Sequence, residues 1–372
     1  GVIMEVSYED CRVFFEAGTA YNPAFDLFDG SVQTGTNIIR DYLRTSQIPK
    51  IDGIYAKEYL EDFDDILPAE SYPIRDQAFF ISHLHLDHMR MMGLISPLVK
   101  VYLKESAQII ERALEDVGMG VEDLRDHQYE DLKEETQIGK IRVRTFVLNP
   151  DSYQDLSFFI ETPDLKIHFT GDVFVYGKYE SGILKELDYL HEHRPDLLVC
   201  EGTRFFKDGT YDDIIPSFKA KDGLLSKDEL DKRILECIEK HPSLVLFNIY
   251  EREMSDVSDF MSYAKKAGRE IVFEPETAHI INSFFGIPVS ILLADTTSYQ
   301  NLPEEIFTMN RIITKQEILF HPDRYLLQNS YPNSLELLDY RNCNALYLHH
   351  SGTPLGPFDP HYQNLMNLIS IC

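Results

Sequence analysis

The chain has 372 residues, 44% of them hydrophobic and 26% charged, with a formal net charge of −27. At this length we expect two domains, or one domain that carries a large insertion. The negative charge counts against nucleic acids as partners in general, although bound divalent metals or a local basic groove can reverse the sign within one cleft.

The chain opens "GVIMEVSYEDCRVFFEAG", which carries no basic leader before an apolar run, and no stretch approaches the roughly 20 apolar residues of a membrane helix. We therefore expect a soluble, cytoplasmic protein that does not act at a membrane. The cysteines lie far apart with no C-x-x-C pair, at Cys11, Cys200, Cys237, Cys343 and Cys372. This spacing favours free thiols over a disulfide framework or a cysteine-rich zinc site.

The first 200 residues are rich in predicted strands. Apolar or alternating runs, typical of strands, occupy residues 2–8, 12–18, 78–83, 99–103, 140–148, 156–162, 165–172 and 196–203, and a helical pattern occupies 106–117.

A regular alternation of helix and strand then begins at residue 226. Helical patterns at 226–240, 256–268 and 276–286 alternate with strands at 243–250, 269–275 and 289–295, the order of a doubly wound parallel sheet. From residue 324 the sequence returns to short strands and Gly/Pro-rich turns. We predict an inserted α/β domain at 205–325, within a strand-rich domain of residues 1–204 and 326–372.

The stretch "SHLHLDH" contains His83, His85, Asp87 and His88 directly after an apolar run. Residues two apart in an extended segment point the same way, so the first two histidines can bind one metal ion. Asp87 and His88 follow at a helix start that can direct them to a second ion. The alternative, a hydrogen-bonded polar turn, would leave three imidazoles and a carboxylate poorly satisfied without a cation.

Together with the downstream "FTGD", this motif resembles the metallo-β-lactamase-fold hydrolases. The resemblance implies a four-layer αβ/βα sandwich, one or two zinc ions with manganese as the alternative, and Asp172 as the aspartate shared by the metals. The inserted α/β segment resembles the β-CASP branch, which includes ribonuclease J and the cleavage-factor nucleases, and Glu201 in "VCEGT" matches its acidic residue. The alternatives are a turn-forming Gly-Asp pair for Asp172 and a strand-end carboxylate that caps the next turn for Glu201.

A histidine from "YLHHSG" near the end of the chain is a further candidate ligand. Neighbouring residues on a strand face opposite ways, so only one of His349 and His350 can reach the site, and the family's His-Ser-Gly loops favour His350. The position of the family's third histidine holds Pro150, which cannot bind a metal, although Asp151 beside it could supply an oxygen. His168 faces the side of Asp172, either as a partner of a ligand or as a histidine packed under the sheet.

These residues predict a hydrolase in which metal-bound water is the nucleophile and Asp87 orients that water or takes its proton. The β-CASP resemblance implies RNA as the substrate. Two alternatives remain, a hydrolase of a small ester or lactone, and a degenerate metal-binding member without turnover because of Pro150. A homodimer is left open.

Overall fold

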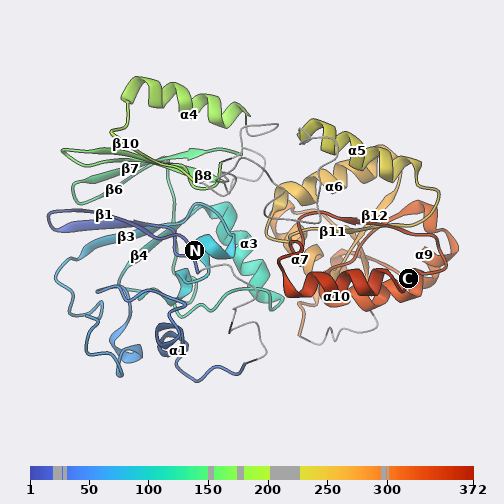
Figure 1. Ribbon diagram of the computed structural model, residues 1–372, viewed down its shortest axis with the longest axis horizontal. Coiled ribbons are helices and arrows are strands. Elements are labelled where there is room, and N and C mark those ends of the chain that lie inside the picture. The colour runs from blue at the N-terminus through green and yellow to red at the C-terminus, as the bar shows by residue number, and fades with distance from the viewer. Residues whose placement is uncertain are drawn as a thin grey trace. The chain divides into compact units, whose positions relative to one another are not determined.

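The computed structural model describes residues 1–19, 27, 32–149, 155–173, 180–201, 227–294, 299 and 301–372. The chain divides into two compact units (Figure 1). The first unit comprises Gly1–Arg112 and Gly120–Gly202, and the second comprises Ala113–Met119 and Thr203–Cys372. Among the described helices, none has the length and apolar character needed to cross a membrane. All five cysteines are free thiols.

The first unit contains two five-stranded sheets. One has the order β1 (Met4–Tyr8), β2 (Cys11–Phe15), β3 (Asp76–Phe80), β4 (Lys100–Leu103) and β5 (Glu130–Asp131), with only β1 antiparallel to its neighbour. The other has the order β10 (Leu197–Val199), β9 (Lys166–Phe169), β8 (Leu156–Glu161), β7 (Ile141–Val147) and β6 (Glu135–Ile138), with only β10 parallel to its neighbour.

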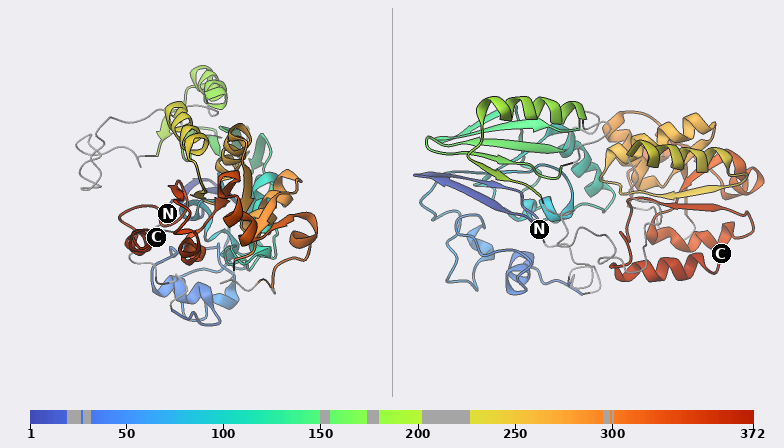
Figure 2. Two further views of the ribbon diagram at one scale, coloured as in Figure 1. Left: turned by 90° about the vertical axis from the view of Figure 1, so that its right-hand side faces the viewer. Right: turned by 45° about the horizontal axis from the view of Figure 1, so that its top comes forward.

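The two sheets pack face to face through a core of fully buried aromatic and branched side chains. Phe15 of β2 lies with its ring centroid 5.2 Å from that of Phe158 in β8 and 5.9 Å from that of Phe169 in β9. Each buried phenylalanine contributes about 1.5–3 kcal/mol relative to an exposed one. Helix α4 (Glu180–His193) covers the outer face of the second sheet, and α1 (Ile38–Arg44) lies beyond the first (Figures 1 and 2). The predicted αβ/βα sandwich is the architecture of this unit.

The second unit is built on one sheet of six parallel strands. Its order is β14 (Arg311–Ile313), β13 (Ser290–Leu292), β12 (Glu270–Phe273), β15 (Tyr325–Gln328), β11 (Val245–Asn248) and β16 (Leu346–His349). The described helices are α5 (Lys227–Lys240), α6 (Met254–Ala267), α7 (Pro275–Phe285), α8 (Glu305–Met309), α9 (Lys315–Phe320) and α10 (Pro360–Ile369). Helices α5 and α6 lie on one side of the sheet and α10 lies on the other (Figures 1 and 2). The predicted doubly wound parallel sheet is thus confirmed.

Strands β15 and β16 lie beside β11 in this sheet, whereas the sequence analysis assigned residues 326–372 to the first domain. The four residues of β15 are all buried, as is typical of a central strand covered on both faces. The short strands and Gly/Pro-rich turns of this segment therefore belong to the end of a parallel sheet. Such turns occur in both kinds of sheet, and composition alone does not distinguish them.

Glu251 follows β11 in the second unit, and the carboxylates of Glu274 and Glu276 act on it electrostatically. Burial raises the pKa of Glu251 to about 7, and the carboxylates of Glu274 and Glu276 add to the effect. Between its unfolded pKa and about pH 7 the folded state binds the extra proton, so the free energy of unfolding falls as the pH rises through this window.

Glu251→Gln is expected to raise the free energy of unfolding by about 1–3 kcal/mol at pH 8 and to change it little at pH 4, because the amide has no charge to bury. Urea denaturation at the two pH values measures the difference. The exposed Glu305 of the same unit provides the control Glu305→Gln, for which we expect little change at either pH. A gain of equal size at both pH values would contradict the explanation.

Candidate metal centre

Four predicted side chains meet at one edge of the sandwich. His83 and His85 lie in the segment that follows β3, and His88 lies in the short helix α2 (Leu86–Met89) that comes next. Asp172 lies just beyond the end of β9 in the other sheet. The ends of these two strands therefore bring together residues that are far apart in the sequence.

The carboxylate of Asp172 is the common neighbour of the three imidazoles. Its Oδ1 lies 3.2 Å from His88 Nε2, and its Oδ2 lies 3.5 Å from His83 Nε2 and 3.8 Å from His85 Nδ1. The ring centroid of His83 is 4.4 Å from that of His85 and 4.1 Å from that of His88. Three nitrogens and two carboxylate oxygens thus face one small volume.

The charges at this centre are strongly coupled. Burial and the neighbouring imidazoles of His88 and His85 lower the pKa of His83. Burial alone would also lower the pKa of His88, but contacts with Asp172 and Glu16 raise it to about 10. Burial would raise the pKa of Asp172, but contacts with the three histidines hold it far below its usual range. A histidine must be neutral to bind a metal, so binding of a cation here would compete with protonation of His88.

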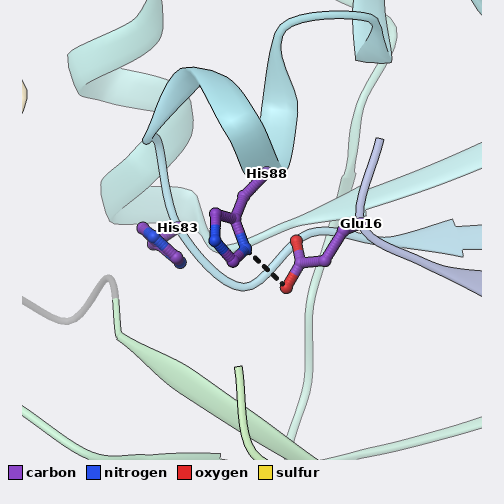
Figure 3. Close-up of side chains that lie close together, drawn as sticks. All are labelled: Glu16, His83 and His88. Atoms are coloured by element: carbon purple, nitrogen blue, oxygen red, sulfur yellow. Dashed lines mark ion pairs between the residues drawn. The ribbon is translucent and has the colours of Figure 1, made fainter. Parts of the chain in front are cut away.

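Glu16, which the sequence analysis missed, is a fifth member of the centre (Figure 3). It follows β2 with φ +66° and is fully buried. Its Oε1 lies 3.4 Å from His88 Nδ1, and its Oε2 accepts a hydrogen bond of 3.2 Å from the amide of Ser82. The only indication of Glu16 in the sequence is its position, a charged residue directly after an apolar strand. In the structure all five residues of that strand are buried.

The outer nitrogens of two imidazoles each face an oxygen, and their inner nitrogens face Asp172. Ser82 Oγ lies 2.7 Å from His83 Nδ1, and Glu16 faces His88 Nδ1. His83 Nε2 is buried and has no hydrogen-bond partner within the described part of the chain. Metal-binding histidines have this arrangement, with the outer nitrogen fixed by an oxygen and the inner one directed at the ion. The residues present therefore fit a metal ion.

Asp87 lies in α2 beside this centre. Its side chain is 43% exposed, and its Oδ2 lies 3.6 Å from His88 Nε2. Its backbone carbonyl accepts a hydrogen bond from Val2 N at 3.0 Å, so the chain that carries it is fixed while the carboxylate reaches solvent.

Glu201 contacts a backbone amide, and His168 contacts a buried carboxylate. Glu201 Oε1 accepts a hydrogen bond of 2.9 Å from Val173 N, directly after Asp172, and its role at the site stays a prediction. His168 Nε2 lies 3.1 Å from the buried Glu186 of α4, so the imidazole packs between sheet and helix.

The remaining candidates fall outside the described residues or belong to the second unit. Asp151 and Pro150 fall outside the described residues. His349 and His350 belong to the second unit, where His349 Nε2 lies 2.8 Å from Pro354 O and His350 Nδ1 lies 3.3 Å from the carboxylate of Asp256. Their role as ligands stays a prediction.

No family model and no curated protein matches the sequence. A solved protein of unknown function from Enterococcus faecalis V583 is 23% identical over all of this chain and 82% of its own, with a TM-score of 0.73. That likeness shows a shared fold. A Cronobacter sakazakii metallo-β-lactamase is 12% identical over 55% of this chain and 68% of its own (TM-score 0.31). An N-acyl homoserine lactone hydrolase is 15% identical over 53% of this chain and 78% of its own (TM-score 0.32).

Proposed function

We propose that this chain is a metal-dependent hydrolase with its metal centre at His83, His85, His88 and Asp172. The observation that carries the proposal is the convergence of three imidazoles on one carboxylate, with the buried His83 Nε2 left without a hydrogen bond. A bound metal supplies an acidified water and polarises the bond to be cleaved.

Nitrogen and carboxylate ligands favour zinc, with manganese as the alternative, and one or two ions. The proposed residues have separate tasks. Asp87, half-exposed beside His88, orients the attacking water and accepts its proton. His350 of the second unit, which the sequence predicts as a ligand, has its Nδ1 3.3 Å from the carboxylate of Asp256.

For the substrate we propose a phosphodiester, and RNA in particular. The chain joins the sandwich that carries the candidate centre to an α/β unit with its own parallel sheet, and the resemblance of this inserted α/β segment to the β-CASP nucleases is what supports RNA. The net charge of −27 makes the metal and local cations essential for holding such a polyanion.

The test has two stages. The metal content of the purified and zinc- or manganese-loaded protein is measured first, and one or two bound equivalents are expected. Hydrolysis of 5′-phosphorylated RNA, a generic phosphodiester and a lactone is then compared, with Asp87→Ala as the inactive control. A protein that retains no metal would end the hydrolase proposal, and cleavage of the lactone alone would remove RNA as the substrate.

Glu16→Gln is expected to weaken metal binding about 10- to 100-fold, because the amide no longer provides a full negative charge to orient His88. Competition against a chelator of known affinity measures the change. Glu61→Gln, which removes an exposed carboxylate of the same unit, serves as the matched control and should bind metal as the parent does. Equal affinities for the two variants would show that Glu16 has no part in the centre.

A further inference from the structure

A cavity of about 290 Å³ in the first unit is lined by lysines. Lys104, Lys133 and Lys185 contribute to its wall, together with Thr145, Phe146 and Val147 of β7. Lys104 follows β4, Lys133 follows β5, and Lys185 lies in the second turn of α4. We call this the lysine cavity.

The charge of the lysine cavity is opposite to that of the whole chain. The only acidic residue among the described lining residues is Glu134, which forms an ion pair with Arg144. Lys133 pairs with Asp131 at the surface, where such a pair is weak. Lys104 Nζ donates to the carbonyl of Leu132 at 3.4 Å, and within the described residues neither Lys104 nor Lys185 has a carboxylate partner. A local cationic site therefore exists in a chain of net charge −27.

Thr145 adds a neutral hydrogen-bonding group to this wall. The residue is 8% exposed, and its Oγ1 has no hydrogen-bond partner among the described residues. A buried hydroxyl without a partner costs free energy unless a ligand or water satisfies it.

The strand directions place the lysine cavity at the edge of the sandwich that holds the metal centre. Lys104 follows β4, which runs parallel to β3, and β3 ends just before His83. Strands β7 and β9 are both antiparallel to β8, so the end of β7 at Val147 lies at the same edge as Asp172 beyond β9. A long substrate bound at this edge can extend from the metal centre to the lysine cavity.

We propose that the lysine cavity binds a phosphate group. Ammonium groups bind phosphate as point charges, and an unpartnered hydroxyl can donate to a phosphate oxygen. The phosphate is either a neighbouring phosphate of the substrate, in which case the assignment rests on the proposed hydrolase function, or free inorganic phosphate.

The first experiment measures binding of inorganic phosphate to the full chain after metal removal with a chelator, so that metal-bound phosphate does not contribute. Isothermal titration should show saturable binding to the parent protein, weakened about tenfold in Lys104→Ala and in Lys185→Ala, since a charged hydrogen bond contributes about 1.4 kcal/mol or more. The matched control is Lys100→Ala, an exposed lysine at the start of β4, the strand that Lys104 follows, and it does not line the cavity. Absence of saturable binding, or an equal loss in Lys100→Ala, would overturn the proposal.

The second experiment identifies the source of the phosphate. With metal-loaded protein, Lys104→Ala should raise KM for 5′-phosphorylated RNA about tenfold and KM for a generic phosphodiester by less, if the site holds a substrate phosphate. Equal changes in the two KM values, with phosphate binding lost in the first experiment, identify free phosphate as the ligand. If no substrate is hydrolysed, the proposed function fails, and the first experiment still decides whether the lysine cavity binds phosphate.

Discussion

Asp172→Ala is expected to abolish metal binding and to reduce kcat/KM for any hydrolysed substrate at least about a thousandfold, which corresponds to roughly 4 kcal/mol of transition-state stabilisation. The reason is geometric. Both oxygens of this carboxylate face the histidines, at 3.2 Å from His88 Nε2 and 3.5 Å from His83 Nε2, so its removal takes away the group around which they are arranged. Mass spectrometry of the metal content and steady-state kinetics measure the two effects.

The matched control is Asp188→Ala, which removes an exposed carboxylate from α4 in the same unit. It should leave both metal content and kinetics at the parent values. Circular dichroism of the two variants establishes that the fold is intact. An Asp172→Ala protein that keeps its full metal content would show that the metal lies elsewhere.

Gly18→Ala is expected to lower the free energy of unfolding by about 3–5 kcal/mol and to reduce the metal content with it. A Cβ atom at this position would lie 1.5 Å from the carbonyl oxygen and 2.0 Å from the carbonyl carbon of Asp87. The neighbouring backbone is fixed by the hydrogen bond of 2.7 Å from Ala17 N to His88 O. The two segments must therefore separate, and the separation displaces Asp87 and His88 from the centre.

Gly118→Ala provides the comparison for Gly18→Ala. Gly118 has φ +75° and no atom within 4 Å of an added Cβ, so only the backbone conformation is strained, at about 1–2 kcal/mol. Denaturation curves and metal content of the two variants are measured together. If both glycines tolerate alanine equally well, the close approach at Gly18 does not restrain the motif.

The histidines of the candidate metal centre were predicted from a local motif and Asp172 from the family resemblance, whereas Glu16 was not predicted. The apolar run of β3 followed by "SHLHLDH" predicts histidines at a strand end, and the structure shows them there. Glu16 reaches the centre because β2 pairs with β3, with Phe15 opposite Phe80, which brings the next residue of each strand to the same edge. Strand pairing of this kind connects residues far apart in the chain, and a short motif contains no information about it.

In the second unit, too, the sequence predicted the individual elements but not which strands lie side by side in the sheet. The alternation of helices and strands predicted a doubly wound sheet because each element has its own hydrophobic period. The position of β15 between β12 and β11 depends on where the chain returns, which no local period encodes. The last two strands were therefore assigned to the wrong sheet, although the strands themselves were predicted.

The second unit contains a segment from the first third of the chain, and this segment decides how the unit could be produced as a separate protein. It includes Ala113–Met119 from the first third of the chain, and the guanidinium of Arg252, which is 7% exposed, donates to the carbonyl of Met119. A fragment that starts at residue 203 would leave a buried cation without this acceptor, at a cost of about 1–3 kcal/mol. Dissection of the protein into independently folding pieces therefore requires the segment 113–119, which contains the end of α3 (Glu105–Asp116) and the residues after it, to be supplied with the C-terminal part as a fused or added peptide.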